Sequence, residues 1–301
     1  MTRILVTGGG GFLGGWISKL LIEGGHEVRI FDRGSERRVV REVVGGAADD
    51  LDWVEGDVMD GAAVTHAAEG CAAIVHLAAL LTPACAADPV RGAEVNLIGT
   101  LNVFEAAKAR GIRRIAYASS AAVFGPDDGE HPRPVTMYGA FKLAGEGCAR
   151  AYWHDAGIAS VGLRPTVVYG PGREIGLTAG PTLACREAVA GRPYVIGYTG
   201  RQDLVFAGDV AAAFAAAATR NLEGAHAVSL GGSVVDVPDI VAAIEAEVPG
   251  AVIGFEGPAV PMASNIAGAG DATILGLAPR TTLRDGIART VAHYRRVAGE
   301  A

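Results

Sequence analysis

The sequence predicts an α/β protein with a doubly wound, mostly parallel sheet and a smaller lobe toward the C-terminus. Short apolar runs alternate with helical patterns through the first half of the chain. The first run, residues 3–7, leads directly into the glycine-rich stretch Gly8–Gly14. The second run, Val28–Phe31, ends in Asp32. Ligands of such sheets bind at the carboxyl ends of the strands, and both features lie there.

Each strand of the central sheet is expected where an apolar, partly β-branched run is bounded by polar or turn residues. Such runs occupy residues 3–7, 28–32, 51–54, 73–77, 113–118 and 158–163. Helices are expected from residue 12 and over residues 93–110 and 136–156, and residues 33–46 are polar and basic. Residues 210–219 are rich in alanine and predict a buried helix, because the run is too short to span a bilayer.

The second half of the chain predicts the smaller lobe, which we expect to bind the substrate. Residues 172–200 are irregular apart from one helix near 182–190. Further helices are expected at 236–248 and 283–297 and a strand at 251–255, whereas the strand-like runs 204–206 and 226–230 are expected to return to the main sheet. The predicted domains are therefore 1–164, with return segments in 202–230, and a lobe formed by 165–201 and 231–301.

Composition limits the classes of partner. Half of the 301 residues are hydrophobic, and the net charge of −7 argues against nucleic acid or an anionic membrane surface. The four cysteines form no Cys-x-x-Cys pair, which predicts buried thiols in a reducing cytoplasm and no metal site. A small-molecule substrate and a cytoplasmic location are the resulting expectations.

The glycine-rich stretch is typical of a site for the pyrophosphate of a dinucleotide. Gly8, Gly11 and Gly14 allow the backbone to bend sharply and to approach the phosphates, where a Cβ atom would clash. A helix beginning near Phe12 and Leu13 would present its unpaired N–H groups to the phosphates. A tight connection between a strand and a helix is the simpler alternative, and Asp32 argues against it.

Asp32 is placed to accept hydrogen bonds from the adenosine ribose. The same carboxylate would repel a 2′-phosphate, so the sequence predicts NAD rather than NADP. Arg33 is the complication, because its guanidinium could bind that phosphate if Asp32 turned aside. Asp57 at the end of the third strand could contact adenine or could cap the following helix, and the residues leave both open.

Tyr138 and Lys142 carry the expected chemistry. They are four residues apart, so they share one face of the predicted helix. An ammonium beside a phenol favours the phenolate and lowers the tyrosine pKa from about 10. Ser120 follows the neighbouring strand and could bind the same substrate oxygen. His76 is expected to be a hydrogen-bonded structural residue. Asn96 is expected either to hydrogen-bond backbone or to have a catalytic role.

Together these motifs resemble those of one protein family. The sequence resembles the extended short-chain dehydrogenases/reductases, also called the NAD-dependent epimerase/dehydratase family, over essentially its whole length. The matching segments are Thr7–Gly14, Gly56–Val58, His76–Ala79, Asn96 with Gly99–Asn102, Ser119–Gly125, Tyr138–Lys142, Leu163–Pro165, Tyr169–Pro171 and Leu275–Gly276. The resemblance implies a Rossmann fold and a homodimer packed through the helices near 95–110 and 137–156.

The resemblance also implies residue roles. Ser120, Tyr138 and Lys142 would be catalytic, with Tyr138 as the general acid/base. The expected NAD-binding residues are Gly8, Gly11, Phe12, Leu13, Gly14, Asp32, Arg33, Asp57, Val58, Leu77, Ala78, Ala79, Asn96, Ser119, Tyr138 and Lys142. The expected substrate-binding residues are Thr82, Ser120, Thr166, Arg173, Thr178 and Arg201.

Departures from the family pattern limit which reactions and substrates of the family are expected for this chain. Ala121 and Ala122 stand where dehydratases of the family carry acidic residues, which argues against dehydration by that route. Val167 replaces the asparagine, and Gln202 the arginine, that usually hold a nucleotide diphosphate. Segments 76–82 and 122–126 also look like the threonine dehydrogenase branch.

The leading expectation is therefore a dehydrogenase/reductase that moves hydride between NAD and a secondary alcohol or ketone on a small polar molecule, such as a sugar, a sugar acid or a hydroxy or amino acid. A nucleotide-sugar 4-epimerase with tightly bound NAD is the alternative. A non-catalytic dinucleotide sensor is the alternative from another class, and the intact Ser120, Tyr138 and Lys142 argue against it.

Overall fold

A computed structural model describes residues 2–126, 129–260, 272–278 and 280–299. Within these ranges the chain forms two compact units. The first contains residues 2–164, 211–229 and 272–277, and the second contains residues 165–210, 230–260, 278 and 280–299.

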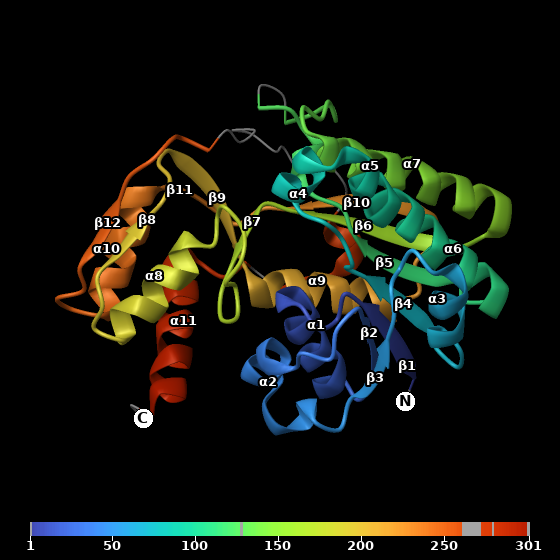
Figure 1. The fold of residues 1–301 in the computed structure, drawn as a ribbon, viewed down its shortest axis with the longest axis horizontal. Helices are drawn as coiled ribbons and strands as arrows, with labels where there is room; N and C mark the ends of the chain where they lie inside the picture. Colours follow the sequence, from blue (N-terminus) through green and yellow to red (C-terminus); the bar gives the residue numbers. More distant parts are fainter. Residues whose placement is uncertain (1, 127–128, 261–271, 279, 300–301) are drawn as a thin grey trace. The chain divides into compact units, whose positions relative to one another are not determined.

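A seven-stranded sheet is the centre of the first unit (Figure 1). Its strands, in spatial order, are β10 (Ala225–Leu230), β6 (Ala159–Pro165), β5 (Arg114–Ala118), β4 (Ala73–His76), β1 (Arg3–Thr7), β2 (Glu27–Asp32) and β3 (Asp52–Glu55). β1 to β6 run parallel. The order reverses direction between β1 and β4, and the crevice at such a switch point is where doubly wound folds bind ligands.

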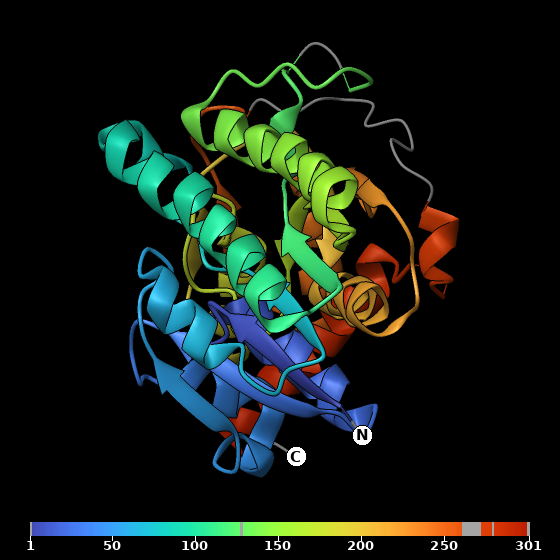
Figure 2. The same ribbon diagram turned by 90° about the vertical axis from the view of Figure 1, so that its right-hand side faces the viewer.

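Helices cover both faces of this sheet. α3 (Gly61–Ala67), α6 (Gly99–Arg110) and α7 (Met137–Ala156) pack on one face, and Figure 2 shows α6 and α7 side by side. α1 (Phe12–Glu23) and the following α2 (Arg38–Val44) pack together on the other face. α9 (Ala207–Thr219) begins in the second unit and continues in the first. The short helices α4 (Thr82–Ala87) and α5 (Pro89–Ala93) follow β4.

The core of the first unit explains the sheet order. Leu5, Phe31, Ile74 and Ile115 come from four neighbouring strands, are fully buried and belong to one apolar cluster with α3, α6 and α7. Burying such side chains stabilises the fold by about 1.5–3 kcal/mol each. Alternate residues of these strands point to opposite faces, so both sides of the sheet are apolar, as expected for parallel strands covered by helices.

The described residues of the second unit form two small sheets and the helices α8, α10 and α11, besides the start of α9. One sheet has the order β11 (Ser233–Asp236), β9 (Arg201–Phe206), β7 (Val167–Tyr169), and the other pairs β12 (Ile253–Phe255) with β8 (Tyr194–Ile196). α8 (Gly180–Val189), α10 (Val237–Glu247) and α11 (Leu283–Ala298) pack against one another. Tyr169, Tyr198 and Phe206 are buried within this unit.

The structure differs from the sequence expectations at three places. The polar, basic stretch after β2 contains α2, because Val40 and Val43 bury one face of that helix. β9 joins the small sheet with β7 and β11, whereas it was expected in the central sheet; β10 does lie in the central sheet. The helix expected over 93–110 is α6 preceded by a π-helical turn over Glu94–Ile98. No helix among the described residues is both long and apolar enough to cross a bilayer.

Candidate active site

The turn between β1 and α1 forms a narrow backbone cradle. Gly8 has φ +67°, and a Cβ there would come within 2.6 Å of the Ala78 backbone nitrogen after β4. A Cβ on Gly14 would overlap the backbone of Gly9. The N-cap of α1 is Gly11, which has no side chain to accept hydrogen bonds from the first helical turn. The geometry therefore fits a pyrophosphate bound by backbone N–H groups.

Asp32 is held at the tip of β2 by the backbone. One carboxylate oxygen accepts a hydrogen bond from Gly10 N at 2.9 Å, and the other accepts from Arg33 N at 2.7 Å. A half-buried carboxylate in this position can accept further hydrogen bonds from the ribose hydroxyls of a dinucleotide.

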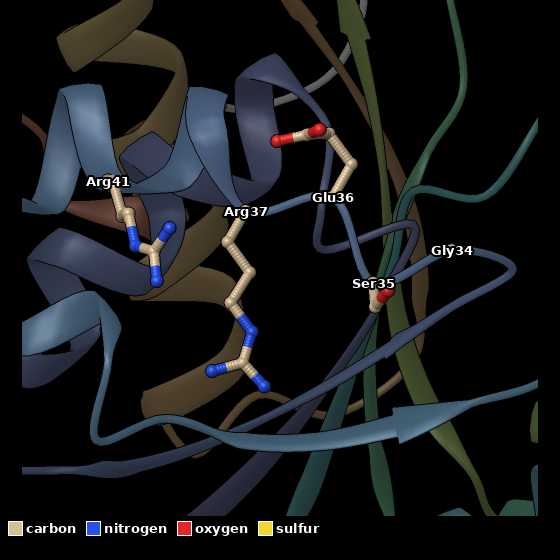
Figure 3. A pocket seen from close by; sticks show the side chains of 5 residues that line it. All are labelled: Gly34, Ser35, Glu36, Arg37 and Arg41. Atoms are coloured by element: carbon tan, nitrogen blue, oxygen red, sulfur yellow. The ribbon is translucent and has the colours of Figure 1, made fainter.

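A basic pocket follows Asp32 and Arg33 along the chain. Gly34, Ser35, Glu36, Arg37 and Arg41 line it, and Figure 3 shows the side chains of both arginines beside it. The Arg37 guanidinium stacks 4.9 Å from the ring centroid of Trp53, and Arg41 forms an ion pair with Asp49 at 2.7 Å.

The contact between Arg37 and Trp53 was not predicted from the sequence. The two residues are 16 positions apart and meet only because β2 and β3 pair in register, Ile30 opposite Trp53.

The end of β4 completes the crevice beside β1. Leu77 N donates to Thr7 O at 2.9 Å, and Ala78 lies against Gly8. Beyond Ala79, the Asn96 side chain accepts a hydrogen bond from Leu80 N at 2.8 Å and donates to Leu80 O at 3.0 Å. Asn96 therefore holds the loop after β4 by its backbone, which is one of the two roles expected for it.

His76 is the structural residue that the sequence predicts. Its Nδ1 lies 2.7 Å from Thr7 Oγ1 and its Nε2 lies 3.1 Å from Thr100 Oγ1. Complete burial lowers the pKa of His76 to about 3, and the charge of Lys142 adds to the shift. The ring is therefore neutral at neutral pH and joins β1, β4 and α6.

Asp57 does not cap the helix after β3. That role belongs to Asp60, whose carboxylate accepts hydrogen bonds from Ala62 N and Ala63 N. Asp57 instead accepts from Met59 N at 3.0 Å and lies 3.7 Å from Arg91. Its second carboxylate oxygen points to the charged end of Arg91, so contact with adenine stays a prediction.

Val58, the other residue expected near adenine, is buried. Its side chain packs against Gly99, and its carbonyl accepts a hydrogen bond from Asn102 Nδ2 at 2.9 Å.

Ser120, Tyr138 and Lys142 lie in one region of the first unit. Ser120 begins the turn after β5, where its Oγ accepts a hydrogen bond from Ala122 N at 3.1 Å. Gly139, in the first turn of α7, lies so close to the Ala122 carbonyl that a Cβ would overlap it. The turn that carries Ser120 therefore packs directly on the helical turn that carries Tyr138.

Lys142 lies beside Tyr138 in a buried position. Its Nζ is 5.6 Å from the centroid of the Tyr138 ring, and the side chain is only 5% exposed. Burial lowers the pKa of Lys142 to about 8, an effect that the nearby Cys85 thiol partly opposes. The ammonium therefore stays mostly protonated at neutral pH and can stabilise a phenolate on Tyr138.

The expected substrate residues divide between the two units. Thr82 starts α4, and Ser120 follows β5, both in the first unit. Thr166, Arg173, Thr178 and Arg201 belong to the second unit. Thr166 Oγ1 donates to Leu230 O at 3.3 Å, and Arg201 is exposed at the start of β9.

A buried ion pair, hydrogen-bonded to the residue before the expected catalytic Ser120, was not anticipated. Glu146 on α7 binds Arg164 at the end of β6 and also accepts from Ser119, so the Ser119 hydroxyl is already engaged. The spacing of four between Lys142 and Glu146 could have indicated it, because such residues share a helix face. Within the described ranges no group of three or more His, Cys, Asp or Glu side chains could hold a metal.

Comparison with known proteins shows the family of the chain. Residues 4–231 match the model of the NAD dependent epimerase/dehydratase family. The chain is 35% identical over 181 residues to a 2-alkyl-3-oxoalkanoate reductase of Stenotrophomonas maltophilia, covering 56% of this chain and 52% of the reductase. It is 32% identical over 224 residues to a UDP-glucose 4-epimerase of Mycolicibacterium smegmatis, covering 70% of this chain and 72% of the epimerase.

Solved structures share the fold over nearly the whole chain. The NAD complex of Thermus thermophilus UDP-glucose 4-epimerase has a TM-score of 0.80 at 29% identity, covering 97% of this chain and 99% of that one. A partial consensus L-threonine 3-dehydrogenase has a TM-score of 0.83 at 23% identity, covering 98% and 99%. The chain spans about half the length of the reductase above. With its glycine cradle, Asp32 and the paired Tyr138 and Lys142, this chain belongs to the NAD-dependent epimerase/dehydratase family, and NAD is its cofactor.

Proposed function

We propose that the protein is a dehydrogenase/reductase that transfers hydride between NAD and a secondary alcohol or ketone on a small polar substrate. The observation that carries the proposal is the buried Lys142 ammonium beside the Tyr138 phenol. A buried cation next to a phenol lowers the cost of forming the phenolate, and a phenolate is a suitable base for an alcohol proton.

The residues of the chain divide the chemistry as follows. The Ser120 hydroxyl and the Tyr138 phenol bind the reacting oxygen. In oxidation the Tyr138 phenolate takes the alcohol proton, and in reduction the phenol returns it to the carbonyl oxygen. Lys142 stabilises the phenolate and contacts the nicotinamide ribose. When bound, NAD would supply the hydride acceptor for oxidation and NADH the hydride donor for reduction, so the hydride and the proton would be transferred to different groups in oxidation and come from different groups in reduction.

We infer that the substrate carries no nucleotide diphosphate. A diphosphate in a closed site needs positive or N–H donors, because unpaired phosphate charge is strongly disfavoured there. Val167 has an apolar, buried side chain, and Gln202 is neutral and 1% exposed. Thr166, Arg173, Thr178 and Arg201, together with Thr82, remain the proposed substrate-binding residues, a set that suits one carboxylate or a polyol.

The direct test is a panel of secondary alcohols, sugars, sugar acids and hydroxy and amino acids, assayed with NAD for NADH absorbance. Net NADH formation with any member supports the dehydrogenase. Tight NAD that co-purifies with the protein, without net NADH formation from any member, contradicts it.

A nucleotide-sugar 4-epimerase is the second candidate, and the identity to the M. smegmatis enzyme favours it. Calorimetry with UDP, UDP-glucose and UDP-galactose separates the two. Weak or undetectable binding of all three supports the small substrate. Micromolar binding of any of them would transfer the proposal to the epimerase.

We further propose that the protein is cytoplasmic and forms a homodimer through α6 and α7. The two helices are joined by a hydrogen bond of 2.7 Å from Tyr152 Oη to Glu105. Trp153 on α7 is partly exposed, as an interface residue in a separated protomer would be. Light scattering on the purified protein measures the mass, and a monomer at micromolar concentration would contradict the dimer.

A further inference from the structure

Three buried polar side chains meet between the segments of the first unit that carry the proposed catalytic residues. Ser119 directly follows β5, Glu146 lies in the third turn of α7, and Arg164 lies near the end of β6. They are 2%, 7% and 7% exposed. We call these three residues the carboxylate clamp.

The hydrogen bonds of the clamp converge on one carboxylate. Ser119 Oγ donates to Glu146 Oε1 at 2.5 Å. Arg164 donates through Nε to Oε1 at 2.7 Å and through a terminal nitrogen to Oε2 at 2.5 Å. The two-bond fork between guanidinium and carboxylate fixes the orientation of both groups, which a single ion pair does not.

Each member of the clamp adjoins a catalytic segment. Ser119 immediately precedes Ser120, and Glu146 lies four residues after Lys142, on the same face of α7. The Arg164 guanidinium lies 5.1 Å from the centroid of the Phe124 ring, in the segment that follows Ser120. The clamp thus joins the strand end that carries Ser120 to the helix that carries Tyr138 and Lys142.

Stability alone is a weak reason for such an arrangement. Removing two charges from water is costly, and well-packed apolar side chains in place of a buried ion pair often give equal or greater stability. A forked pair with a third hydrogen bond does, however, restrict geometry, and catalytic geometry must be held to fractions of an ångström.

We propose that Glu146 is a positioning residue that, held by Arg164 and Ser119, sets the placement of Ser120 relative to Tyr138 and Lys142. The catalytic roles of these three residues rest on the proposed function. The effect of the clamp on Lys142 does not, because Lys142 lies beside Tyr138 whatever the substrate.

The test uses variants that keep the net charge. Glu146→Asp keeps the carboxylate but shortens its reach, and Ser119→Ala removes one hydrogen bond and leaves the ion pair. Ser160→Ala is the matched control, because Ser160 is also 2% exposed and its hydroxyl has no hydrogen-bond partner among the described residues. If Glu146→Asp does not fold, Ser119→Ala still decides the outcome through the titration of Tyr138 in the cofactor-free protein, which no contact between Ser119 and the cofactor can affect.

The first readout compares the affinities of NADH and ADP, so it needs no substrate. ADP probes the glycine turn and Asp32, whereas NADH also needs Lys142 in place. We expect Glu146→Asp to weaken NADH binding about tenfold and Ser119→Ala to weaken it about threefold. The affinity for ADP should stay unchanged in both variants. An unchanged ratio of NADH to ADP affinity in the variants would show that the clamp is merely structural and would overturn the proposal.

The second readout is the phenolate absorbance of Tyr138 in the cofactor-free protein, obtained by subtracting the titration of the same variant carrying Tyr138→Phe. Displacing the ammonium should raise the pKa of Tyr138 by about 1 in Ser119→Ala and leave it unchanged in Ser160→Ala. The other titratable groups whose charges interact with Lys142, His76 and Cys85, are present in every variant. A Tyr138 titration in Ser119→Ala identical to that of the wild type would also overturn the proposal. Neither readout depends on whether the enzyme is a dehydrogenase or an epimerase.

Discussion

Replacing Asp32 with asparagine should relax the preference for NAD over NADP. The amide of Asn can still accept a hydrogen bond from Gly10 N or Arg33 N, so the end of β2 should keep its conformation. The substitution removes the negative charge that would face a 2′-phosphate. It leaves in place Arg33, which follows Asp32 in the sequence, and Arg37 and Arg41, which line the pocket after it.

The size of the effect follows from the position of the carboxylate. Two unit charges about 4 Å apart near a protein surface interact by about 4 kcal/mol. Asp32 is half-buried, and both of its oxygens already accept backbone hydrogen bonds, so solvent and these dipoles reduce the effect to about 2 kcal/mol. The wild-type protein should therefore bind NADP about thirtyfold more weakly than NAD, and Asp32→Asn should remove most of that difference.

Fluorescence titration with NADH and NADPH measures both affinities. Asp52→Asn is the matched control, because it makes the same change of charge at the start of β3, where Asp52 pairs with Arg29. In the Asp32→Asn background, Arg37→Ala should selectively weaken NADPH. If wild-type protein binds NADPH as tightly as NADH, Asp32 does not discriminate between the cofactors, and the electrostatic reasoning is refuted.

Three further outcomes can be measured. Tyr138→Phe should lower kcat on a confirmed substrate by about 10²–10⁴ while NADH affinity stays nearly unchanged; a wild-type rate would exclude Tyr138 as the acid/base. Gly8→Ala should abolish NADH binding and lower the melting temperature, because φ is +67° and a Cβ would meet Ala78 N at 2.6 Å, and Gly25→Ala, also at positive φ but in open space, is its control. Because burial lowers the pKa of Lys142 from 10.5 to about 8, the unfolded chain binds more protons between these values. The difference in free energy of unfolding between the wild type and Lys142→Met, measured by denaturant titration, should therefore change in favour of the wild type by about 2 kcal/mol from pH 8 to pH 10. A difference that does not change with pH would contradict the burial of Lys142.

Much of the first unit could be predicted because its signals are local. The apolar runs, the glycine turn and Asp32 at a strand tip all depend on residues close together in sequence. The spacing of Tyr138 and Lys142 likewise needs only the geometry of one helix. The parallel order of β1 to β6 then follows from the right-handed connection of successive strands.

The predictions from sequence were wrong where contacts between residues far apart in the sequence determine the structure. β9 pairs with β7 and β11, and nothing within residues 201–206 distinguishes that sheet from the central one. The segment after β2 is polar in composition, yet Val40 and Val43 form one apolar face of the short helix α2. That face is buried because α2 packs against α1. Arg37 meets Trp53 for a similar reason, through the pairing of two strands.

The same distinction explains why the cofactor and the chemistry are easier to infer than the substrate. The proposed cofactor and catalytic residues follow strand ends or occupy successive helical turns of the first unit, so each has a position set by regular structure. The proposed substrate residues Arg173 and Thr178 lie in the irregular stretch between β7 and α8. Irregular segments change with little cost to the core, so the substrate can change without disturbing the regular structure that carries the glycine turn and Tyr138. The reductase and the epimerase that resemble this chain act on different molecules, as that reasoning requires.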